Sequence, residues 1–470
     1  MTKPNPPKLV IPSSAGVAED DDPLTPAGRL FLHPGLDTII HCVVGVEHYV
    51  DIQTIKSMVK DVFISKQPRF SSLLVRKGSR EFWRKTEVDI DRHFVVVDSS
   101  GPPEDFDRAV NDYVAKLSVS VPLSLDKPLW EVHVMVNYRC AVFRIHHALG
   151  DGISLMALLL GGCRKVSDQT SVVFPEVSKP KKSPLKEGFW RRFFAALKYA
   201  LFSFLFCVEF LLRSLVVGDP RTAISGGEGI ELWPRKLATA RFSIADMKAV
   251  KNAIPRATIN DVLLGVISAG LTRYLGHHSD KRLEKGLRLT GVAMINLREQ
   301  SGNQELSVMM KKSSRARWGN KFGMLLLPVH CNKNVDHPFD YVVKCKTMID
   351  AKKRSIEAHF SYGIGNLMMT LFGLKFVFMT YYKAMCNTSF TISNIMGPEE
   401  RIAIDGNPIK FLRVSTSSLP HSLTMHMLSY AGRADMQIMA AKDIIPDPEF
   451  LAKCFEDALL EMKEAALSSA

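Results

Sequence analysis

The sequence predicts a protein with two domains that both mix helices and strands. The chain has 470 residues, and a single hydrophobic core stops growing well before that length. Helical and strand patterns occur on both sides of residues 164–188, a stretch rich in Ser, Pro and Lys that is typical of an interdomain linker. With 46% hydrophobic and 23% charged residues, the composition is that of a globular protein.

The first domain is assigned to residues 26–163 and follows an N-terminal arm. Residues 1–25 are rich in proline and then acidic, which predicts a flexible arm, and they lack the apolar core of a secretory signal. A β-hairpin is predicted around the polar turn Asn137–Arg139, because an apolar, β-rich run lies on each side of it. Apolar residues recur at helical spacing in two other stretches. The hairpin runs are 132–136 and 140–145, and the helical stretches are 54–64 and 154–160.

The most apolar stretch of the chain is 189–217, and it is assigned to a membrane-associated helix. A spanning helix needs ~20 mostly apolar residues, but Lys198, Glu209 and Arg213 interrupt this one. The basic side chains can snorkel to the membrane surface, whereas Glu209 is unfavourable in hydrocarbon. Three interpretations stay open: a helix in the membrane interface, a membrane span, or a buried core helix. Basic residues beside aromatic ones at the start of the stretch favour the interfacial helix.

A second apolar stretch, 366–385, is rich in Met and aromatic residues, and its only charged residues are Lys375 and Lys383. Taken alone, this composition predicts a core helix. Placed beside 189–217, the stretch would instead line a lipid-binding groove.

The second domain is assigned to residues 218–470. The stretch 258–275 predicts an amphipathic helix, for which Thr258 and Asn260 are candidate N-caps. Its apolar residues Val262, Val266 and Ile267 share one face. The stretch 450–467 predicts a closing helix.

Charge and cysteine content limit the partners of the chain. A net charge of +13 favours an anionic partner, such as a membrane surface, a phosphorylated cofactor or nucleic acid. The basic residues are scattered and show no zinc-finger or helix-turn-helix spacing, so nucleic acid is not predicted. None of the eight cysteines forms a CxxC pair, which argues against a zinc ribbon and fits a reducing compartment.

Two adjacent histidines, His146 and His147, stand in the stretch RIHHALGDGIS, 144–154. Neighbouring side chains at the end of a strand point to opposite faces, so the pair is poorly placed to bind one metal ion. Alternation puts His147 on the face of Ile145 and Phe143, in an apolar space. An imidazole with a pKa near 6.5 is a suitable general base there.

Asp151 and two glycines complete this motif. Asp151 is too close in sequence to be a remote triad member, but it can lock the turn by pairing with an arginine elsewhere. Gly150 and Gly152 permit left-handed backbone angles and close approach. The alternative is an ordinary strand–turn–helix without chemistry. Since no GxSxG elbow, P-loop or GxGxxG pattern is present, direct transfer is favoured over a covalent enzyme intermediate.

HHALGDG, 146–152, resembles in full the HHxxxDG signature of the wax ester synthase/diacylglycerol acyltransferase family, a branch of the CoA-dependent acyltransferases. PLSLDKPLW is similar to the PLW motif of the family, but Ser124 stands where an acidic residue is frequent. The resemblance extends from about residue 25 to the C-terminus and is closest to the plant branch. Further similar blocks are TINDVLL at 258–264, NLREQ…GNKFG at 296–323 and SNIMGP at 393–398.

The resemblance implies two α/β domains of chloramphenicol-acetyltransferase-like fold with a tunnel between them. His147 matches the catalytic histidine, and Arg298 is the expected ion-pair partner of the structural Asp151. Asn394 is a candidate oxyanion donor or a loop-structuring residue. The other supporting positions are His146, Gly152, Asn260 and Asp261, and the last two are equally well explained as a helix N-cap. No metal or bound cofactor is expected.

The activity implied is transfer of a fatty acyl group from acyl-CoA, as co-substrate, to a long-chain alcohol or to diacylglycerol. The expected location is the cytosolic face of the endoplasmic reticulum membrane, or also the plasma membrane. Two alternatives stay open. One is a non-catalytic lipid-binding protein, which the intact His147–Asp151 pair disfavours. The other is an enzyme for polar metabolite alcohols, which the apolar stretch 189–217 and the missing DFGWG motif disfavour.

Overall fold

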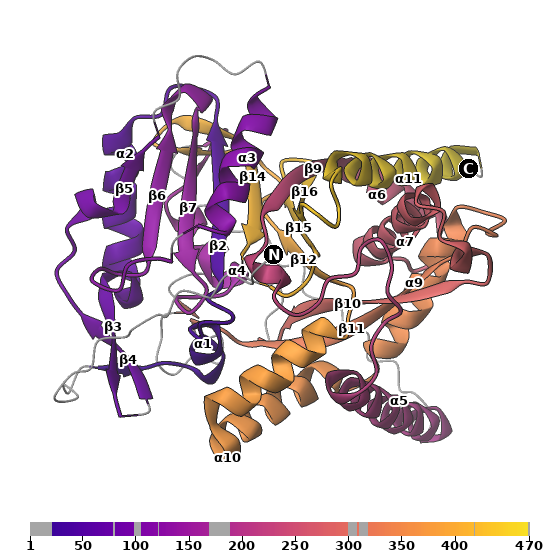
Figure 1. The fold of residues 1–470 in the computed structure, drawn as a ribbon. Helices are drawn as coiled ribbons and strands as arrows, with labels where there is room; N and C mark the ends of the chain where they lie inside the picture. Colours follow the sequence, from indigo (N-terminus) through magenta and orange to yellow (C-terminus); the bar gives the residue numbers. More distant parts are fainter. Residues whose placement is uncertain are drawn as a thin grey trace.

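The computed structural model describes residues 21–78, 80–97, 105–120, 122–168, 189–298, 308–309, 318–417 and 419–468. Two large sheets stand side by side, with helices packed around them (Figure 1). Residues 1–20 of the predicted arm and 169–188 of the predicted linker lie outside the described residues, while Asp22–Pro23 and Arg164–Lys165 form short strands. The division of the chain into domains at these segments stays a prediction.

The first large sheet has seven strands in the order β5-β6-β7-β2-β14-β13-β8. The predicted hairpin is confirmed, because β6 and β7 pair antiparallel and the turn between them passes through Arg139 in the left-handed region. The strands are β2 (Ile39–Val46), β5 (Phe94–Val96), β6 (Trp130–Met135), β7 (Cys140–His146), β8 (Arg164–Lys165), β13 (Ile402–Ile404) and β14 (Asn407–Thr416).

Short helices and a small sheet surround this first sheet. The helix predicted at 54–64 is present as α2 (Ile52–Met58), which continues as a π-helical turn, and the one at 154–160 is α4 (Gly152–Gly161). The other elements are α1 (Pro26–Phe31), α3 (Phe106–Ser118) and the sheet β1-β4-β3, formed by β1 (Asp22–Pro23), β3 (Ser72–Lys77) and β4 (Arg80–Lys85).

The second large sheet has the order β11-β10-β12-β15-β16-β9. Its strands are β9 (Arg235–Ser243), β10 (Leu287–Asn296), β11 (Phe322–Cys331), β12 (Phe390–Met396), β15 (Leu423–Tyr430) and β16 (Arg433–Ala441). Four helices accompany it, namely α6 (Ile244–Ala253), α7 (Ile259–His277), α9 (Phe339–Lys352) and α11 (Pro448–Ser468), and α11 is the predicted closing helix. Apolar residues of α7 and α11 form one core with the sheet.

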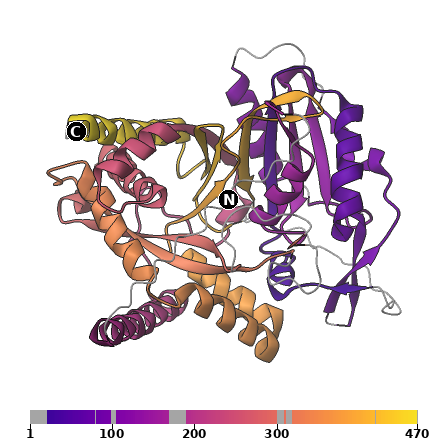
Figure 2. The ribbon, with the colours of Figure 1, turned by 180° about the vertical axis from the view of Figure 1, so that it is seen from behind.

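The C-terminal half of the chain contributes strands to the first sheet. β14 comes late in the sequence but pairs antiparallel with β2, so that Thr416 lies opposite Ile40. In Figures 1 and 2 this yellow-orange strand lies beside the indigo and magenta strands. Side chains from both halves of the sequence therefore meet where the sheets face each other.

The helix predicted at 258–275 is α7, and its N-terminus corrects one expectation. Thr258 is the N-cap, and its side chain and that of Asp261 form a reciprocal capping box. Asn260 is exposed and does not cap the helix. Val262, Val266 and Ile267 are all buried as expected, but residues on the other faces are buried too, so α7 is a core helix and not an amphipathic one.

The two apolar stretches form α5 (Phe189–Leu215) and α10 (Glu357–Cys386), which lie together at the lower edge of the molecule in Figure 1. Only 6% of the most apolar segment of each helix is buried inside the molecule. The core-helix prediction for 366–385 is therefore wrong, and the core-helix interpretation of 189–217 is excluded. Both helices are long and apolar enough to cross a membrane by length and composition alone.

Candidate active site

His147 lies directly after β7, in the turn that leads into α4, and its backbone N–H donates to Thr38 O at 2.8 Å. Its side chain faces a cavity of about 250 Å³ between the two large sheets. The first sheet contributes Ile40 and Thr416, and the second contributes Asn394 and His426. The histidine singled out by the sequence thus stands where the two halves of the molecule meet.

One amide side chain sets the tautomer of His147. Asn320 Nδ2 donates to His147 O at 2.8 Å, which leaves Asn320 Oδ1 as the acceptor that lies 3.1 Å from His147 Nδ1. Nδ1 must therefore carry the proton, and Nε2 is the basic nitrogen. The Phe31 ring stacks on the imidazole with 4.1 Å between centroids, and this contact fixes the plane of the ring.

The surroundings of His147 also keep the imidazole neutral. Burial lowers its pKa to about 4, although the Asp151 charge and the Asn320 hydrogen bond act in the opposite direction. A charged imidazole loses its hydration among apolar neighbours such as Phe31 and Phe322. At neutral pH, the side chain is therefore ready to accept a proton.

Asp151 and Arg298 form the predicted ion pair, with Arg298 Nη1 2.7 Å from Asp151 Oδ2. The Arg298 side chain is fully buried, and it also donates to Ser154 Oγ at 3.2 Å and to Gly319 O. Asp151 is the N-cap of α4 and accepts from Ser154 N at 3.0 Å. The carboxylate is thus committed to holding the turn and takes no part in proton transfer.

His146 has a separate structural position. Ala148 N donates to His146 Nδ1 at 3.1 Å, so that Nε2 carries the proton and donates to Asp37 Oδ1 at 3.1 Å. The side chain is buried and does not line the cavity. The adjacent histidines therefore have different partners.

The glycines of the motif serve close approach and not left-handed geometry, which corrects part of the expectation. Neither Gly150 nor Gly152 has a positive φ. A Cβ on Gly152 would lie 2.9 Å from Ile395 Cδ1, and one on Gly150 would lie 3.1 Å from the Trp318 ring. Small residues are needed here because the second half of the chain packs directly against the turn.

The remaining predicted positions divide into two groups. Asn394 lines the cavity and donates from Nδ2 to Asn260 Oδ1 at 2.7 Å, which brings Asn260 to the rim of the site. Asp261 is fully buried in the capping box and does not line the cavity. The helix-cap explanation is therefore right for Asp261 and wrong for Asn260.

Sequence reasoning missed two residues of the site. Asn320 was included in the GNKFG block without a role. His426 lines the cavity from β15, where Nε2 contacts Thr416 Oγ1 at 3.3 Å. Burial lowers the His426 pKa to about 4, and among the described residues its Nδ1 has no partner. Its signal in the sequence is one histidine in an apolar strand, which is equally typical of a core residue.

Comparison with known proteins assigns the family. The model of the wax ester synthase/diacylglycerol acyltransferase catalytic domain matches residues 52–216, and that of the WS/DGAT C-terminal domain matches residues 318–463. Wax ester synthase/diacylglycerol acyltransferase 11 of Arabidopsis thaliana is 35% identical, covering 95% of this chain and 96% of its own. Wax ester synthase/diacylglycerol acyltransferase 2 of the same plant is also 35% identical, covering 96% and 97%.

Solved structures support the fold. A wax ester synthase/diacylglycerol acyltransferase from Marinobacter aquaeolei VT8 matches with a TM-score of 0.58 at 17% identity, covering 94% of this chain and 99% of that chain. A trichothecene 15-O-acetyltransferase from Fusarium sporotrichioides matches with a TM-score of 0.58 at 11% identity, covering 97% and 99%. The predicted two-domain fold of the CoA-dependent acyltransferases is confirmed. With full-length relatives above 30% identity and a histidine set between the domains, this chain belongs to the wax ester synthase/diacylglycerol acyltransferase family of acyltransferases.

Proposed function

We propose that this protein transfers a fatty acyl group from acyl-CoA to the hydroxyl of a long-chain alcohol, and also of diacylglycerol, with His147 as the general base. The observation that carries the proposal is the hydrogen bond between His147 and Asn320, which leaves a neutral Nε2 at a cavity between the domains. A neutral imidazole nitrogen at such a place suits the deprotonation of an alcohol.

In the proposed reaction, Nε2 takes the hydroxyl proton while the alcohol oxygen attacks the thioester carbonyl. A C–O bond forms, and the carbonyl electron pair moves to oxygen. When this tetrahedral intermediate collapses, the C–S bond breaks and the CoA thiolate receives the proton from the His147 imidazolium. The Asp151 charge favours the transient imidazolium, and general-base assistance typically contributes ~10²- to 10⁴-fold.

The amide of Asn394 is a candidate donor to the oxyanion. One of its N–H groups is used by Asn260, and the other is available to a substrate oxygen in the cavity that Asn394 lines.

Membrane association is supported by the orientation of α5. Its buried positions include the polar residues Ser203, Arg213 and Ser214, and Glu209 pairs with Lys352 at 3.4 Å and with Arg288. The basic Arg191 and Lys198 are exposed near the start of the helix. From Leu201 to Leu215 the exposed positions are all apolar, and they include Phe204, Leu205, Val208, Leu211, Leu212 and Leu215. This pattern is the reverse of a surface helix in water. We infer a helix that lies in the membrane interface, with Glu209 held against the protein, at the cytosolic face of the endoplasmic reticulum.

The alternative functions fit the residues less well. A non-catalytic lipid-binding protein has no need for a neutral base with a fixed tautomer. An enzyme for polar metabolite alcohols has no need for two apolar helices that face outward. The positive net charge of +13 suits the phosphates of CoA and an anionic membrane surface.

The test is acyl transfer in membranes from a host that lacks such enzymes. Labelled palmitoyl-CoA is supplied with hexadecanol or with diacylglycerol, and the parent is compared with His147→Ala and with the control His48→Ala, since His48 is exposed. Ester from the parent and the control, but not from His147→Ala at equal protein level, is expected. Equal ester from His147→Ala would exclude His147 as the base. The rates of ester formation with hexadecanol and with diacylglycerol show which acceptor is preferred.

A further inference from the structure

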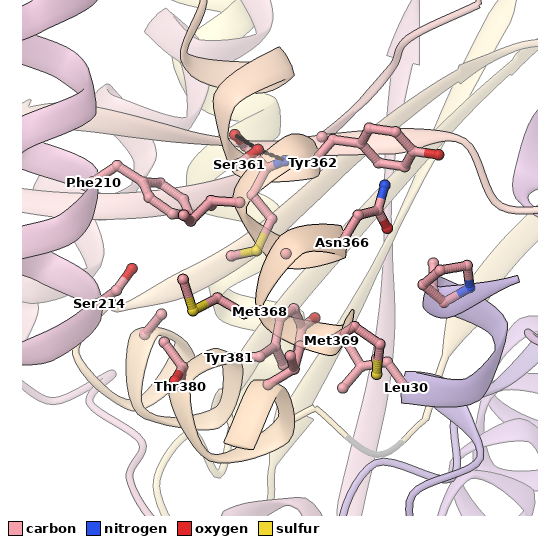
Figure 3. A pocket seen from close by; sticks show the side chains of 18 of the residues that line it. Leu30, Phe210, Ser214, Ser361, Tyr362, Asn366, Met368, Met369, Thr380 and Tyr381 are labelled. Carbon is pink, nitrogen blue, oxygen red and sulfur yellow. Dashed lines mark hydrogen bonds between the residues drawn. The ribbon is translucent and has the colours of Figure 1, made fainter. Parts of the chain in front are cut away.

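A second cavity, of about 300 Å³, lies beside the one at His147, between α1, α5, α10 and β11 (Figure 3). None of its described lining residues is charged. In Figure 3, Phe210 and Ser214 come from α5, Leu30 comes from α1, and Met368 and Met369 come from α10. A cavity with such walls suits a hydrocarbon ligand and would exclude a charged one.

The cavity exists because α10 is bent. Gly373 has φ 77° and ψ −178°, which interrupts the helix. A straight helix would separate Ser361 from Ala384 by about 35 Å, yet both residues line this one cavity. The two halves of α10 therefore lie on either side of the space.

The inner end of the cavity reaches the reaction site. Phe322 and Tyr381 line both this cavity and the one that contains His147. The Phe322 ring centroid is 6.3 Å from that of His147. The Tyr381 side chain is buried, and its hydroxyl has no partner among the described residues. The junction thus offers one hydrogen-bonding group at the end of an apolar space.

The outer end of the cavity opens on the apolar face of α5 and α10. Leu211, Leu215 and Phe376 line the cavity and are nevertheless 40%, 48% and 43% exposed. Further outward-facing apolar residues surround this mouth, including Leu212 on α5 and Phe372 on α10. The mouth therefore opens on the surface that we propose contacts lipid.

We propose that this cavity binds the hydrocarbon chain of a long-chain substrate, which enters sideways between α5 and α10 from a lipid surface and reaches His147 past Phe322 and Tyr381. The inference deepens the proposed function and rests on it for the identity of the substrates. The acyl group of acyl-CoA and the long-chain acceptor share this chemistry. The Tyr381 hydroxyl marks the point where the chain ends and the polar group of the substrate begins.

Two glycines on α10 allow a matched test. Gly365 lines the cavity, whereas Gly363 is exposed and does not line it. A Cβ would meet nothing within 4 Å at either position, and neither glycine has a positive φ, so a side chain is accepted at both without backbone strain. Gly365→Leu should fill the cavity, and Gly363→Leu controls for the gain in helix propensity and for added apolar surface.

The expected result is a change in chain-length preference. Gly365→Leu should lower the ratio of kcat/KM for the long substrate to that for the short one by about 10-fold or more, because one misplaced methylene in an apolar pocket already costs about 10- to 200-fold. One arm compares hexadecanol with decanol at fixed palmitoyl-CoA, and the other compares palmitoyl-CoA with decanoyl-CoA at fixed alcohol. The arm that responds identifies the chain. An unchanged ratio in both arms, or an equal change in Gly363→Leu, would overturn the proposal.

A binding measurement separates this inference from the proposed reaction. A diazirine-bearing hexadecanol analogue and a diazirine-bearing palmitoyl-CoA are photolysed with the full chain in membranes, and the labelled peptides are mapped. We expect labelling within 361–384 in the parent and in His147→Ala, and less in Gly365→Leu but not in Gly363→Leu. Labelling of the parent at this segment, if the parent showed no acyl transfer, would sustain the chain site and reject the reaction. Acyl transfer by the parent without labelling of 361–384 would sustain the reaction and reject the chain site. If Gly365→Leu loses activity with both chain lengths, the labelling still shows whether the substitution blocks binding of the chain.

Discussion

At the scale of single residues, the chemistry of His147 depends on one nitrogen that has a partner and one that is open to the cavity. Asn320 holds Nδ1–H at 3.1 Å, and Phe31 stacks on the ring. Burial disfavours the imidazolium. A base with a lowered pKa is a weaker proton acceptor, but it remains in its active form over a wide range of pH.

The first prediction concerns the pH dependence of kcat/KM. His147 acts as a neutral base, and its pKa is lowered to about 4, so activity should be lost only as the pH falls through the acid range, below about pH 5. An unperturbed histidine would lose the base form near pH 6.5. Return of each sample to neutral pH before a second assay separates protonation from irreversible unfolding. An acid limb near pH 6.5 would contradict the role of burial.

The second prediction concerns Asn320 as a positioning residue. Asn320→Ala removes the acceptor for Nδ1–H and should lower kcat by about 10- to 100-fold, part of the ~10²- to 10⁴-fold that general-base assistance contributes. Asn334→Ala, an exposed amide, should change nothing. Asn320→Asp keeps an acceptor but adds a charge that stabilises the imidazolium, so it should move the acid limb of kcat/KM to higher pH. An unmoved limb would mean that Asn320 has only a structural role.

What the sequence reveals at this scale depends on separation along the chain. His147 and Asp151 lie within one motif, and strand alternation pointed to His147 before any family resemblance. Asn320 reaches His147 across 173 positions, and no local pattern predicts such a contact. Arg298 could be predicted as the partner of Asp151 only from the family resemblance.

At the scale of elements, the turn before α4 is fastened to the other half of the molecule. Asp151 caps α4, and its second oxygen accepts from Arg298 and, at 3.3 Å, from Lys321 N. Arg298 lies two residues after the end of β10. The ion pair therefore links the element that carries His147 to the sheet that carries the opposite wall of the cavity.

The third prediction is that Arg298→Ala lowers the free energy of unfolding by about 3–5 kcal/mol, because it leaves the Asp151 charge buried without its partner. Lys165→Ala, which breaks the exposed pair with Glu400 at 2.9 Å, should cost less than about 1 kcal/mol. Denaturant unfolding of the purified chain measures both. The double variant Asp151→Asn with Arg298→Met keeps an N-cap without the buried charge, and it should be less destabilised than Arg298→Ala. Equal costs for Arg298→Ala and Lys165→Ala would contradict a buried, strong pair.

Element prediction failed where composition cannot distinguish core from lipid. Helices α7 and α10 are both apolar in the sequence; apolar spacing predicts an amphipathic helix for the first, and composition predicts a core helix for the second. In the structure α7 is buried all round, whereas α10 is bent at Gly373 and faces outward. Apolar residues suit either environment, so only the neighbours of a helix show which one applies.

At the scale of the whole molecule, three features follow one another in space from the surface to the domain interface: the exposed apolar face, the α5–α10 cavity and His147. Phe376 lines the mouth, Tyr381 the junction and His147 the reaction site. A membrane would thus supply long-chain substrates on the side where the cavity opens. On α5, apolar side chains such as Leu205 and Leu212 are exposed, whereas the charged Glu209 pairs with Lys352 of the protein. Because the exposed apolar side chains are separate from the His147 cavity, membrane binding can be tested independently of catalysis.

The last prediction is that two acidic substitutions on the outer face of α5 release the protein from membranes. Leu205 and Leu212 are 49% and 50% exposed on that face, and Leu205→Glu with Leu212→Glu should cost several kcal/mol of apolar transfer and charge burial if the face lies in lipid. The matched control is Leu460→Glu with Leu467→Glu on α11, where the leucines are 48% and 64% exposed away from α5. Flotation with vesicles that contain anionic lipid should show loss of binding only for the α5 variant. Transfer to short, water-soluble substrates should persist, because no residue of the His147 cavity is changed. Retained flotation of the α5 variant would mean that the exposed leucines of this helix face something other than lipid.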